Sequence, residues 1–176
     1  MKLVVVFLAI ALLVLGCGGG PAAGSWQGQG ISLAWPAGWD PDLKRVMPSP
    51  VEPLLGATVL CESQHKKPYG QVVLMTRVLT EGETLQGVFD KTYGELADAH
   101  RSTLMHPTSG STTVSGLPAL MESYAAPVGE PFYQYWDVWW ESGRRLFVLE
   151  GWTYTDFADE LHPDFEQMRS GLVMND

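Results

Sequence analysis

The chain has 176 residues, of which 45% are hydrophobic and 18% charged, and its formal net charge is −9. This acidic balance argues against a nucleic-acid-binding protein, which requires clustered lysine and arginine, and it disfavours docking of a folded domain on anionic lipid head groups. About 150 residues remain after the N-terminal segment, which is enough for one domain with a full hydrophobic core.

A secretory signal peptide is predicted at the N-terminus. A short charged start precedes an unbroken apolar run over residues 3–15, and Gly16-Cys17 follow. A run of this length is too short to span a bilayer comfortably, and a small residue at its end is typical of a processing site. We therefore assign residues 1–16 to a signal peptide and exclude them from the fold.

The sequence VLGC at positions 14–17 resembles the lipobox of bacterial lipoproteins. The resemblance implies cleavage before Cys17 and acylation of that cysteine. The protein would then be exported and held on a membrane by its acyl chains, each buried CH₂ contributing about 0.8 kcal/mol. An ordinary signal peptide with an incidental cysteine, or an uncleaved anchor, is the alternative.

Residues 17–25 are then the lipidated cysteine and a flexible tether of small residues. The residue after Cys17 is Gly18. An aspartate at this position would resemble the signal that retains enteric lipoproteins in the inner membrane. In a host with two membranes we therefore expect anchoring to the outer membrane, with the protein facing the periplasm.

Strand patterns dominate the first half of the single domain that we predict over residues 26–176. Residues 28–35 alternate, and the two-residue period places Ile31, Leu33 and Trp35 on one face before a proline turn. This segment is predicted to be the first strand.

Two further strands are predicted over residues 57–64 and 71–79, joined as a hairpin by a polar turn. The proline-rich segment that precedes them, residues 48–53, is predicted to be a loop. Cys61 lies in the first of these strands and has no intramolecular partner once Cys17 is acylated. It is either buried as a small hydrophobe or exposed as a reactive thiol, and its apolar neighbours favour burial.

The hydrophobic period then changes to that of a helix. Residues 84–104 carry apolar side chains at steps of three and four, which predicts an amphipathic helix packed on a sheet. The segment HPTSGS, residues 106–111, is predicted to be the loop that ends it. The apolar stripe consists of Leu85, Val88, Phe89, Tyr93, Leu96, Ala97 and Leu104.

Four more strands and a closing helix complete the chain. Residues 112–127 predict two short strands around Gly116-Leu117-Pro118, and residues 133–154 predict a ring-rich hairpin with Ser142-Gly143 as its turn. The closing helix is predicted to begin at Pro163, where the missing N–H costs nothing, with Phe165, Met168 and Leu172 on one face. Strands grouped between helices indicate the α+β class, an antiparallel β-sheet with helices packed on it.

Three segments, ISLAWPAGW (31–39), SGLPALMESY (115–124) and DFEQMRSGL (164–172), together with the order of the elements, resemble the PsbP-like superfamily. Within it the chain is most similar to the bacterial DcrB-like lipoproteins, which are also exported and acylated. The resemblance implies an antiparallel sheet sandwiched by helices, an α/β/α sandwich. It supplies no family catalytic residues, because members serve as assembly factors and binding modules.

Motifs of metal, cofactor or catalytic sites are not found in the sequence. The four histidines (65, 100, 106 and 162) lie on different predicted elements, without the i, i+4 pair or Cys/His spacing of a zinc site. There is no G-x-S-x-G elbow, P-loop or dinucleotide-binding glycine pattern. We therefore predict no metal, no cofactor and no catalytic residues.

The hairpin at residues 133–154 supplies the candidate site. The two-residue period sorts its side chains onto two faces. One is a core face with Phe132, Trp136, Val138, Trp140, Phe147 and Leu149, and only Gln134 and Arg145 polar. The other face combines aromatic rings with two acids, which are diagonal neighbours in the assumed register. The candidate ligand- or partner-binding residues on it are Tyr133, Tyr135, Asp137, Trp139, Glu150 and Trp152.

Two interpretations of the second face remain open. Carboxylates among rings are costly to bury unpaired, and tyrosine and tryptophan beside acids suit sugars, amines or the basic side chains of a partner. Such a face would be a binding groove. Alternatively a helix covers most of the face, and Asp137 and Glu150 lie at its edge or pair with arginine.

Three functions follow from these observations. The leading hypothesis is a non-enzymatic envelope lipoprotein that binds a partner protein or a small ligand. The second is a small envelope hydrolase that uses Asp137 and Glu150 as an acid–base pair on neighbouring strands. The third is a structural or chaperone-like accessory protein.

Overall fold

The computed structural model describes residues 24–43, 45, 47–99, 105–127 and 132–175. The predicted signal peptide, Cys17 and most of the tether lie outside these residues. The elements follow in the order β1 (Gly24–Gly28), β2 (Ile31–Trp35), β3 (Trp39–Asp40), α1 (Val51–Leu55), β4 (Thr58–Lys66), β5 (Tyr69–Val78), α2 (Leu85–Ala99), β6 (Met105–Val114), β7 (Leu117–Pro127), β8 (Phe132–Ser142), β9 (Arg145–Tyr154), the 3₁₀ turn η1 (Thr155–Phe157), α3 (Ala158–Ser170) and β10 (Val173–Met174).

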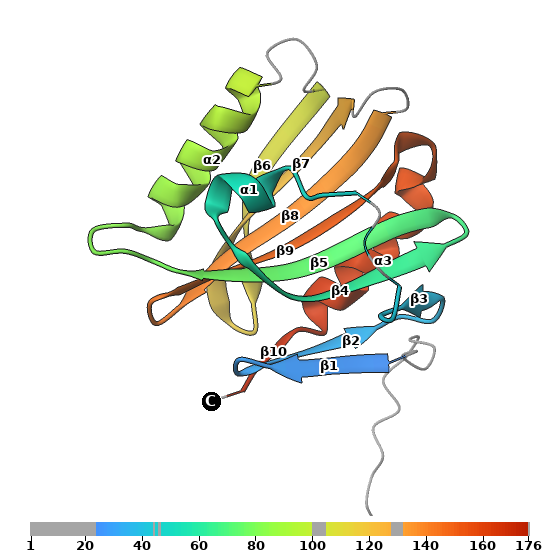
Figure 1. Ribbon diagram of the computed structural model, residues 1–176, viewed down its shortest axis with the longest axis horizontal. Coiled ribbons are helices and arrows are strands. Elements are labelled where there is room, and N and C mark those ends of the chain that lie inside the picture. The colour runs from blue at the N-terminus through green and yellow to red at the C-terminus, as the bar shows by residue number, and fades with distance from the viewer. Residues whose placement is uncertain (1–23, 44, 46, 100–104, 128–131, 176) are drawn as a thin grey trace, which may run out of the picture.

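Seven strands form the main sheet in the order β3-β4-β5-β9-β8-β7-β6, and β1, β2 and β10 form a second, three-stranded sheet. Every pairing is antiparallel. Helices pack on both sides of the main sheet (Figure 1), with α1 and α2 over one face and α3 over the other. The predicted α+β class, an antiparallel sheet with helices packed on it, is confirmed.

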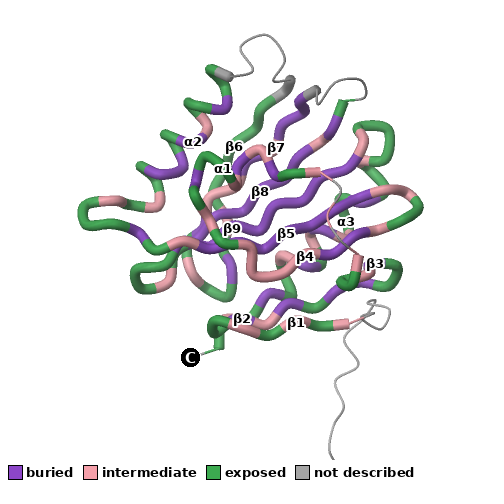
Figure 2. Tube along the Cα trace, viewed as in Figure 1, coloured by how far each residue is buried: buried purple, intermediate pink, exposed green. Residues whose placement is uncertain are grey.

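Two hydrophobic layers lie on the two faces of the main sheet. The first packs α3 and the small sheet against the sheet, and it contains Ile31, Leu33 and Trp35 on their predicted common face. The second lies beneath α1 and α2. Figure 2 shows that burial is concentrated along β5, β9 and β8, the central strands, because each of them is covered on both faces.

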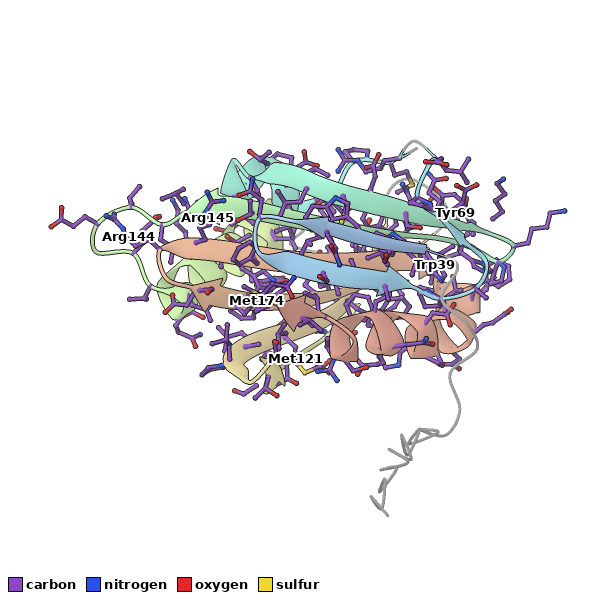
Figure 3. The ribbon with its side chains drawn as sticks, turned by 90° about the horizontal axis from the view of Figure 1, so that it is seen from below. Trp39, Tyr69, Met121, Arg144, Arg145 and Met174 are labelled. Carbon is purple, nitrogen blue, oxygen red and sulfur yellow. The ribbon has the colours of Figure 1, made fainter. Side chains whose placement is uncertain are left out.

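Different turns lie at the two ends of the main sheet. Seen from below (Figure 3), Trp39 and Tyr69 lie at the end where β3 meets the β4–β5 hairpin. Arg144 and Arg145 lie at the opposite end, at the tip of the β8–β9 hairpin. The first described residue, Gly24, pairs with Trp35 at the end of β2. It therefore lies at the same end of the domain as β3.

The predicted loop at residues 48–53 is wrong, because part of it forms α1. The hydroxyl of Ser49 accepts hydrogen bonds from the backbone N–H groups of Val51 (3.1 Å) and Glu52 (2.9 Å), which caps the new helix. Pro53 is tolerated in the first turn, where no N–H partner is needed. Burial of Val51 and Leu55 then fixes the turn as a helix.

Three other boundaries differ from the predictions. Residues 106–111, predicted as a loop, belong to β6, whose polar edge is stabilised by pairing with β7. The last two residues of the predicted tether belong to β1, which pairs with β2. Pro163 lies inside α3, which starts at Ala158, because burial of Leu161 holds the preceding turn in place. The helix predicted to reach residue 104 is described as far as Ala99.

The hairpin turn is also shifted by one residue. Ser142 pairs with Arg145, so the two turn residues are Gly143 and Arg144 rather than Ser142 and Gly143. Gly143 has a φ of 61°, which places the positive angle at the first turn position, as in a type II′ turn. The sorting of side chains onto faces is unaffected, but every cross-strand pair in the predicted register is wrong.

Gly151→Ala should lower the free energy of unfolding by about 1–3 kcal/mol, because overpacking forces neighbours to move. A Cβ at this position in β9 would lie 2.5 Å from Cδ2 of Phe165, which packs α3 onto the sheet. Gly94→Ala in α2 is the control, since its Cβ meets no atom within 4 Å and should stabilise the helix by about 0.5–1 kcal/mol. Urea unfolding measures both effects. Equal stability of the two variants would contradict this packing.

Candidate functional site

The six candidate residues lie together on one face of β8 and β9, and all of them are buried. Asp137 and Trp152 are each 1% exposed, and Glu150 and Trp139 are 0% exposed. The cover comes from α1, α2 and the segment that precedes α1. The structure therefore places the six residues in an enclosed aromatic–carboxylate layer. The apolar residues of the core face are buried as predicted, except for Phe132 at the start of β8, which is 38% exposed. Of its two polar residues, Arg145 is exposed and Gln134 is half-buried.

The corrected register brings the two acids directly opposite each other. Asp137 pairs with Glu150 across β8 and β9, and Glu122 of β7 pairs with Asp137 on the other side. Directly opposed residues in antiparallel strands are about 4.5–5.5 Å apart at their Cα atoms and point to the same face. A row of three carboxyl side chains therefore crosses the middle of the sheet beneath the helices.

An aromatic row lies on one side of this row of acids, and a row with Trp139 between Leu120 and Val148 lies on the other. Tyr124, Tyr135 and Trp152 are opposed in one neighbouring row, and the rings of Tyr124 and Tyr135 stack with centroids 5.0 Å apart. Trp139 lies in the other row and packs edge-on against Phe89 of α2 at 5.5 Å. The acids are thus separated from solvent by rings within the sheet as well as by the helices above it.

Asp137 is held by α2. Its Oδ2 accepts a short hydrogen bond from the hydroxyl of Tyr93, and this hydroxyl also accepts a hydrogen bond from Nε1 of Trp139 at 3.2 Å. Burial raises the pKa of Asp137 to about 8, the Tyr93 hydrogen bond opposes the shift, and the Glu122 charge adds to it. Asp137 is therefore largely protonated at neutral pH.

Glu150 is held by the segment before α1. Its Oε2 accepts a hydrogen bond from Oγ of Ser49 at 2.9 Å. Burial raises the pKa of Glu150 well above its usual range, and the neighbouring Asp137 charge adds to the increase. The Ser49 hydrogen bond and the more distant Arg45 charge lower it. A buried pair of this kind cannot carry two negative charges without a large desolvation and repulsion cost.

Among the described residues, Arg45 is the cation whose charge acts on Glu150. Its guanidinium forms a short ion pair with Glu52 of α1 and lies 3.6 Å from Oε2 of Glu62 of β4. Arg45 is thus shared among several acids. In the described part of the chain, Oδ1 of Asp137 and Oε1 of Glu150 have no hydrogen-bond partner.

Sequence reasoning missed the partners of the two acids. Tyr93 was expected only as part of an apolar stripe, Ser49 as part of a loop, and Glu122 as a strand residue without a role. Tyr93 belongs to the apolar stripe of the predicted helix, whose residues recur at steps of three and four. That position places its hydroxyl on the side of the helix that faces the sheet, and this is the signal that the sequence offered. Nothing local in the sequence connects Ser49 with Glu150, which is 101 residues away.

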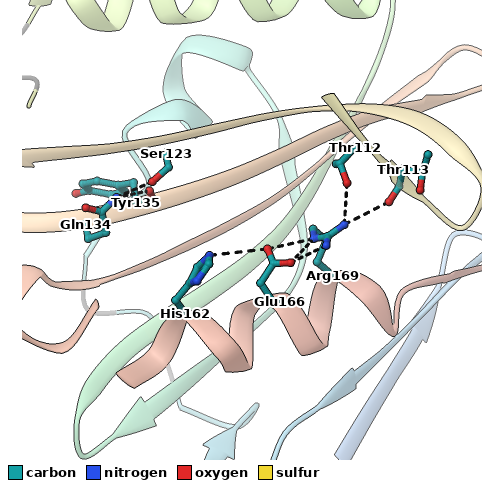
Figure 4. Close-up of polar contacts among 8 residues, drawn as sticks. All are labelled: Thr112, Thr113, Ser123, Gln134, Tyr135, His162, Glu166 and Arg169. Atoms are coloured by element: carbon teal, nitrogen blue, oxygen red, sulfur yellow. Dashed lines mark hydrogen bonds and ion pairs between the residues drawn. The ribbon is translucent and has the colours of Figure 1, made fainter. Parts of the chain in front are cut away.

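A hollow lies on the opposite face of the sheet, beside α3. It is a cleft of about 310 Å³ whose floor includes Trp136, packed between the rings of His162 (5.3 Å) and Phe165 (5.9 Å). Figure 4 shows the polar rim, where Glu166 accepts a 2.6 Å hydrogen bond from Nη2 of Arg169. Arg169 in turn donates to the Thr112 hydroxyl at 3.0 Å. Glu166 and Arg169 are therefore paired with each other on α3, and Arg169 also joins α3 to β6.

No metal-binding group of three or more His, Cys, Asp or Glu residues occurs in the described part of the chain. The ring of His65 contacts the carbonyl oxygen of Pro68 at 2.7 Å, while His162 lies 3.9 Å from Glu166. His100 and the side chain of His106 lie outside the described residues. Cys61 is partly buried in β4, and burial raises its pKa to about 12, so it is a poor nucleophile.

No family model matches the chain, and no curated protein matches its sequence. Solved structures do match it. The solution structure of cyanobacterial PsbP (CyanoP) from Synechocystis sp. PCC 6803 superposes with a TM-score of 0.60 at 16% identity, over 92% of this chain and 98% of that one. The chain has a PsbP-like fold.

A second match is the crystal structure of LpqN from Mycobacterium tuberculosis, which is described as involved in cell envelope biogenesis. It superposes with a TM-score of 0.57 at 14% identity, over 83% of each chain. At these identities the likeness establishes the fold and nothing finer. Among the described helices, none is both long and apolar enough to cross a membrane.

The buried acid should make the stability of the protein depend on pH. The pKa of Asp137 is about 8 in the folded protein and about 3.9 when unfolded, so its stabilising contribution is complete below about pH 4 and is lost as the pH rises towards 8. Asp137→Asn should flatten this decrease by up to about 1.4 kcal/mol per pH unit. Urea unfolding at pH 5, 6.5 and 8 measures it. Glu141→Gln, at an exposed position on the same strand, should keep the wild-type slope, and an unchanged slope in Asp137→Asn would contradict the assignment.

Proposed function

We propose that this protein is an exported, lipid-anchored accessory protein of the bacterial envelope, which binds a partner protein or a small ligand and has no enzymatic activity. Its folded domain would be held on the membrane through acylated Cys17, and the outer membrane, facing the periplasm, is the proposed location. Among proteins of PsbP-like fold, we place it closest to the DcrB-like lipoproteins.

If Cys17 is acylated, the spacing between it and the domain limits how far the domain can lie from the membrane. β1 begins at Gly24, seven positions after Cys17. A fully extended chain spans at most about 3.6 Å per residue, so an acylated Cys17 would keep the start of β1 within about 25 Å of the membrane. The domain would then act close to the membrane surface. The envelope role described for LpqN is consistent with this placement.

The observation that carries the non-enzymatic assignment is the enclosure of Asp137 and Glu150. A glycosidase needs its two carboxyl groups on either side of a bond that the substrate presents to them. Here the two acids lie side by side in one row of the sheet, are at most 1% exposed and are covered by helices on this face. Their hydrogen bonds to Ser49 and Tyr93 join the cover to the sheet, so no substrate reaches the two acids while the cover is closed.

The six residues of the aromatic–carboxylate layer remain our proposed binding site. Tyr and Trp rings with two acids suit a cationic or polyhydroxyl group, such as an amine, a sugar or a lysine side chain of a partner. Because the layer is enclosed, binding there requires part of its cover to move away.

The anchor is tested by Cys17→Ala in the full chain, expressed in a bacterial host fed an alkyne-bearing fatty acid. We expect the wild type to incorporate the label and to sediment with membranes, and the variant to lose both properties because acylation requires the thiol. Cys61→Ala is the matched control and should behave as the wild type. Label in Cys17→Ala that equals the wild-type level would contradict anchoring at this residue.

The hydrolase alternative is tested by release of reducing ends from peptidoglycan and other envelope polysaccharides. We expect the wild-type protein to release none above a buffer control, because the acids are enclosed. Release by the wild type that is abolished in both Asp137→Asn and Glu150→Gln would overturn the non-enzymatic assignment.

A further inference from the structure

The elements that cover the aromatic–carboxylate layer, α1 with the segment before it and α2, are hydrogen-bonded to the two opposed acids. Ser49, which caps α1, donates its hydroxyl hydrogen to Glu150, and Tyr93 of α2 donates to Asp137. Each covering helix is therefore tied to one member of the same cross-strand pair. A change in the charge of the pair therefore affects both hydrogen bonds, Ser49 to Glu150 and Tyr93 to Asp137.

The two halves of the cover differ in how much they bury. α2 has fifteen residues and buries Val88, Phe89 and Leu96, and the ring of its Tyr93 packs 5.6 Å from Trp139. The α1 segment, defined here as residues 47–55, contains a five-residue helix that buries only two large apolar side chains, Val51 and Leu55. Elements with few buried apolar contacts open at lower free energy than the rest of a fold. The α1 segment is therefore the weaker half.

The charges around the pair are predominantly acidic. The titratable side chains that surround the Asp137–Glu150 pair come from the neighbouring strands, from both helices and from the segment before α1. They are Glu122 and Tyr124 of β7, Tyr135 of β8, Tyr93 of α2, Glu52 of α1, Glu62 of β4, and Arg45. Arg45 is the cation among these groups, and Glu52 and Glu62 already pair with it. A second negative charge on the pair would thus be poorly compensated while the cover is closed.

We propose that Asp137 and Glu150 form a proton-controlled latch, which keeps the α1 segment closed over the sheet while the pair retains a proton and releases it when both acids are ionised. Release admits water to the pair, and hydration removes the cost of two adjacent buried charges. The larger α2 stays in place, so the change is local and does not unfold the domain.

Opening exposes a defined part of the layer. The α1 segment contacts β5 and β9, since the backbone N–H of Met47 donates to Oε1 of Gln71 at 3.4 Å and Ser49 donates to Glu150. Trp152 lies opposite Gln71 in the sheet. An open α1 segment therefore presents Gln71, Glu150 and Trp152, a combination suited to a cationic group. This last step rests on the proposed binding function, whereas the latch itself does not.

Hydrogen–deuterium exchange of the full chain in detergent micelles tests the latch. Exchange is compared at pH 6 and pH 9 after correction for the intrinsic pH dependence of amide exchange. We expect protection of residues 47–55 to fall at least tenfold at pH 9, and protection of α3 (158–170) to change less than twofold. In Glu150→Gln, which cannot carry the second charge, the α1 segment should stay protected at pH 9.

Asp137→Asn is the second variant, because it keeps the Ser49–Glu150 hydrogen bond and removes the opposing charge. It should also abolish the loss of protection, whereas Glu141→Gln should behave as the wild type. Persistence of the loss in both Glu150→Gln and Asp137→Asn would overturn the proposal. An equal loss of protection in α3 would overturn it as well, because the change would then be global.

A hexalysine peptide separates the latch from the binding function. If the wild type opens at pH 9 and binds hexalysine more than tenfold more tightly than Glu150→Gln, both proposals are supported. Opening without binding supports the latch and contradicts the placement of a cation site in the layer.

Discussion

Two acidic side chains lie directly opposite each other in the middle of the seven-stranded sheet, and most of the surrounding structure follows from the need to accommodate them. Asp137 and Glu150 are enclosed, and burial raises the pKa of each. Among the residues that the structure describes, the pair is accommodated with protons and hydroxyl donors, and Arg45 is the cation whose charge acts on Glu150. The Tyr93 and Ser49 hydroxyls that serve as donors come from the two elements that cover the face.

The aromatic side chains around the pair have two physical roles. Their rings bury large apolar areas on both faces of β8 and β9, which stabilises the centre of the sheet. On the face beneath α1 and α2 they also exclude water from the acids, which strengthens every electrostatic interaction there. The same residues that suggested a binding surface are therefore the residues that keep the acids dry.

The PsbP-like architecture gives this arrangement its asymmetry. One face of the main sheet is covered by α3 and the small sheet in a continuous apolar layer. The other is covered by two separate helices, one of them only five residues long, over a layer that contains polar groups. The α1 segment, which has few buried apolar contacts, is therefore the part of the cover that the proposed latch would release.

The sequence by itself determined the α+β class, the amphipathic character of α2 and which side chains of β8 and β9 share a face. These properties depend on local backbone geometry, because helices repeat every 3.6 residues and strands every two. It also placed the six candidate residues on one face, but not Glu122 and Tyr124, which lie beside them in β7. The tertiary structure decided the register, which places Asp137 opposite Glu150 because Gly143, and not Ser142, occupies the first turn position. It alone decided that the layer is covered, since the contact between Ser49 and Glu150 joins residues far apart in the chain and has no local signal.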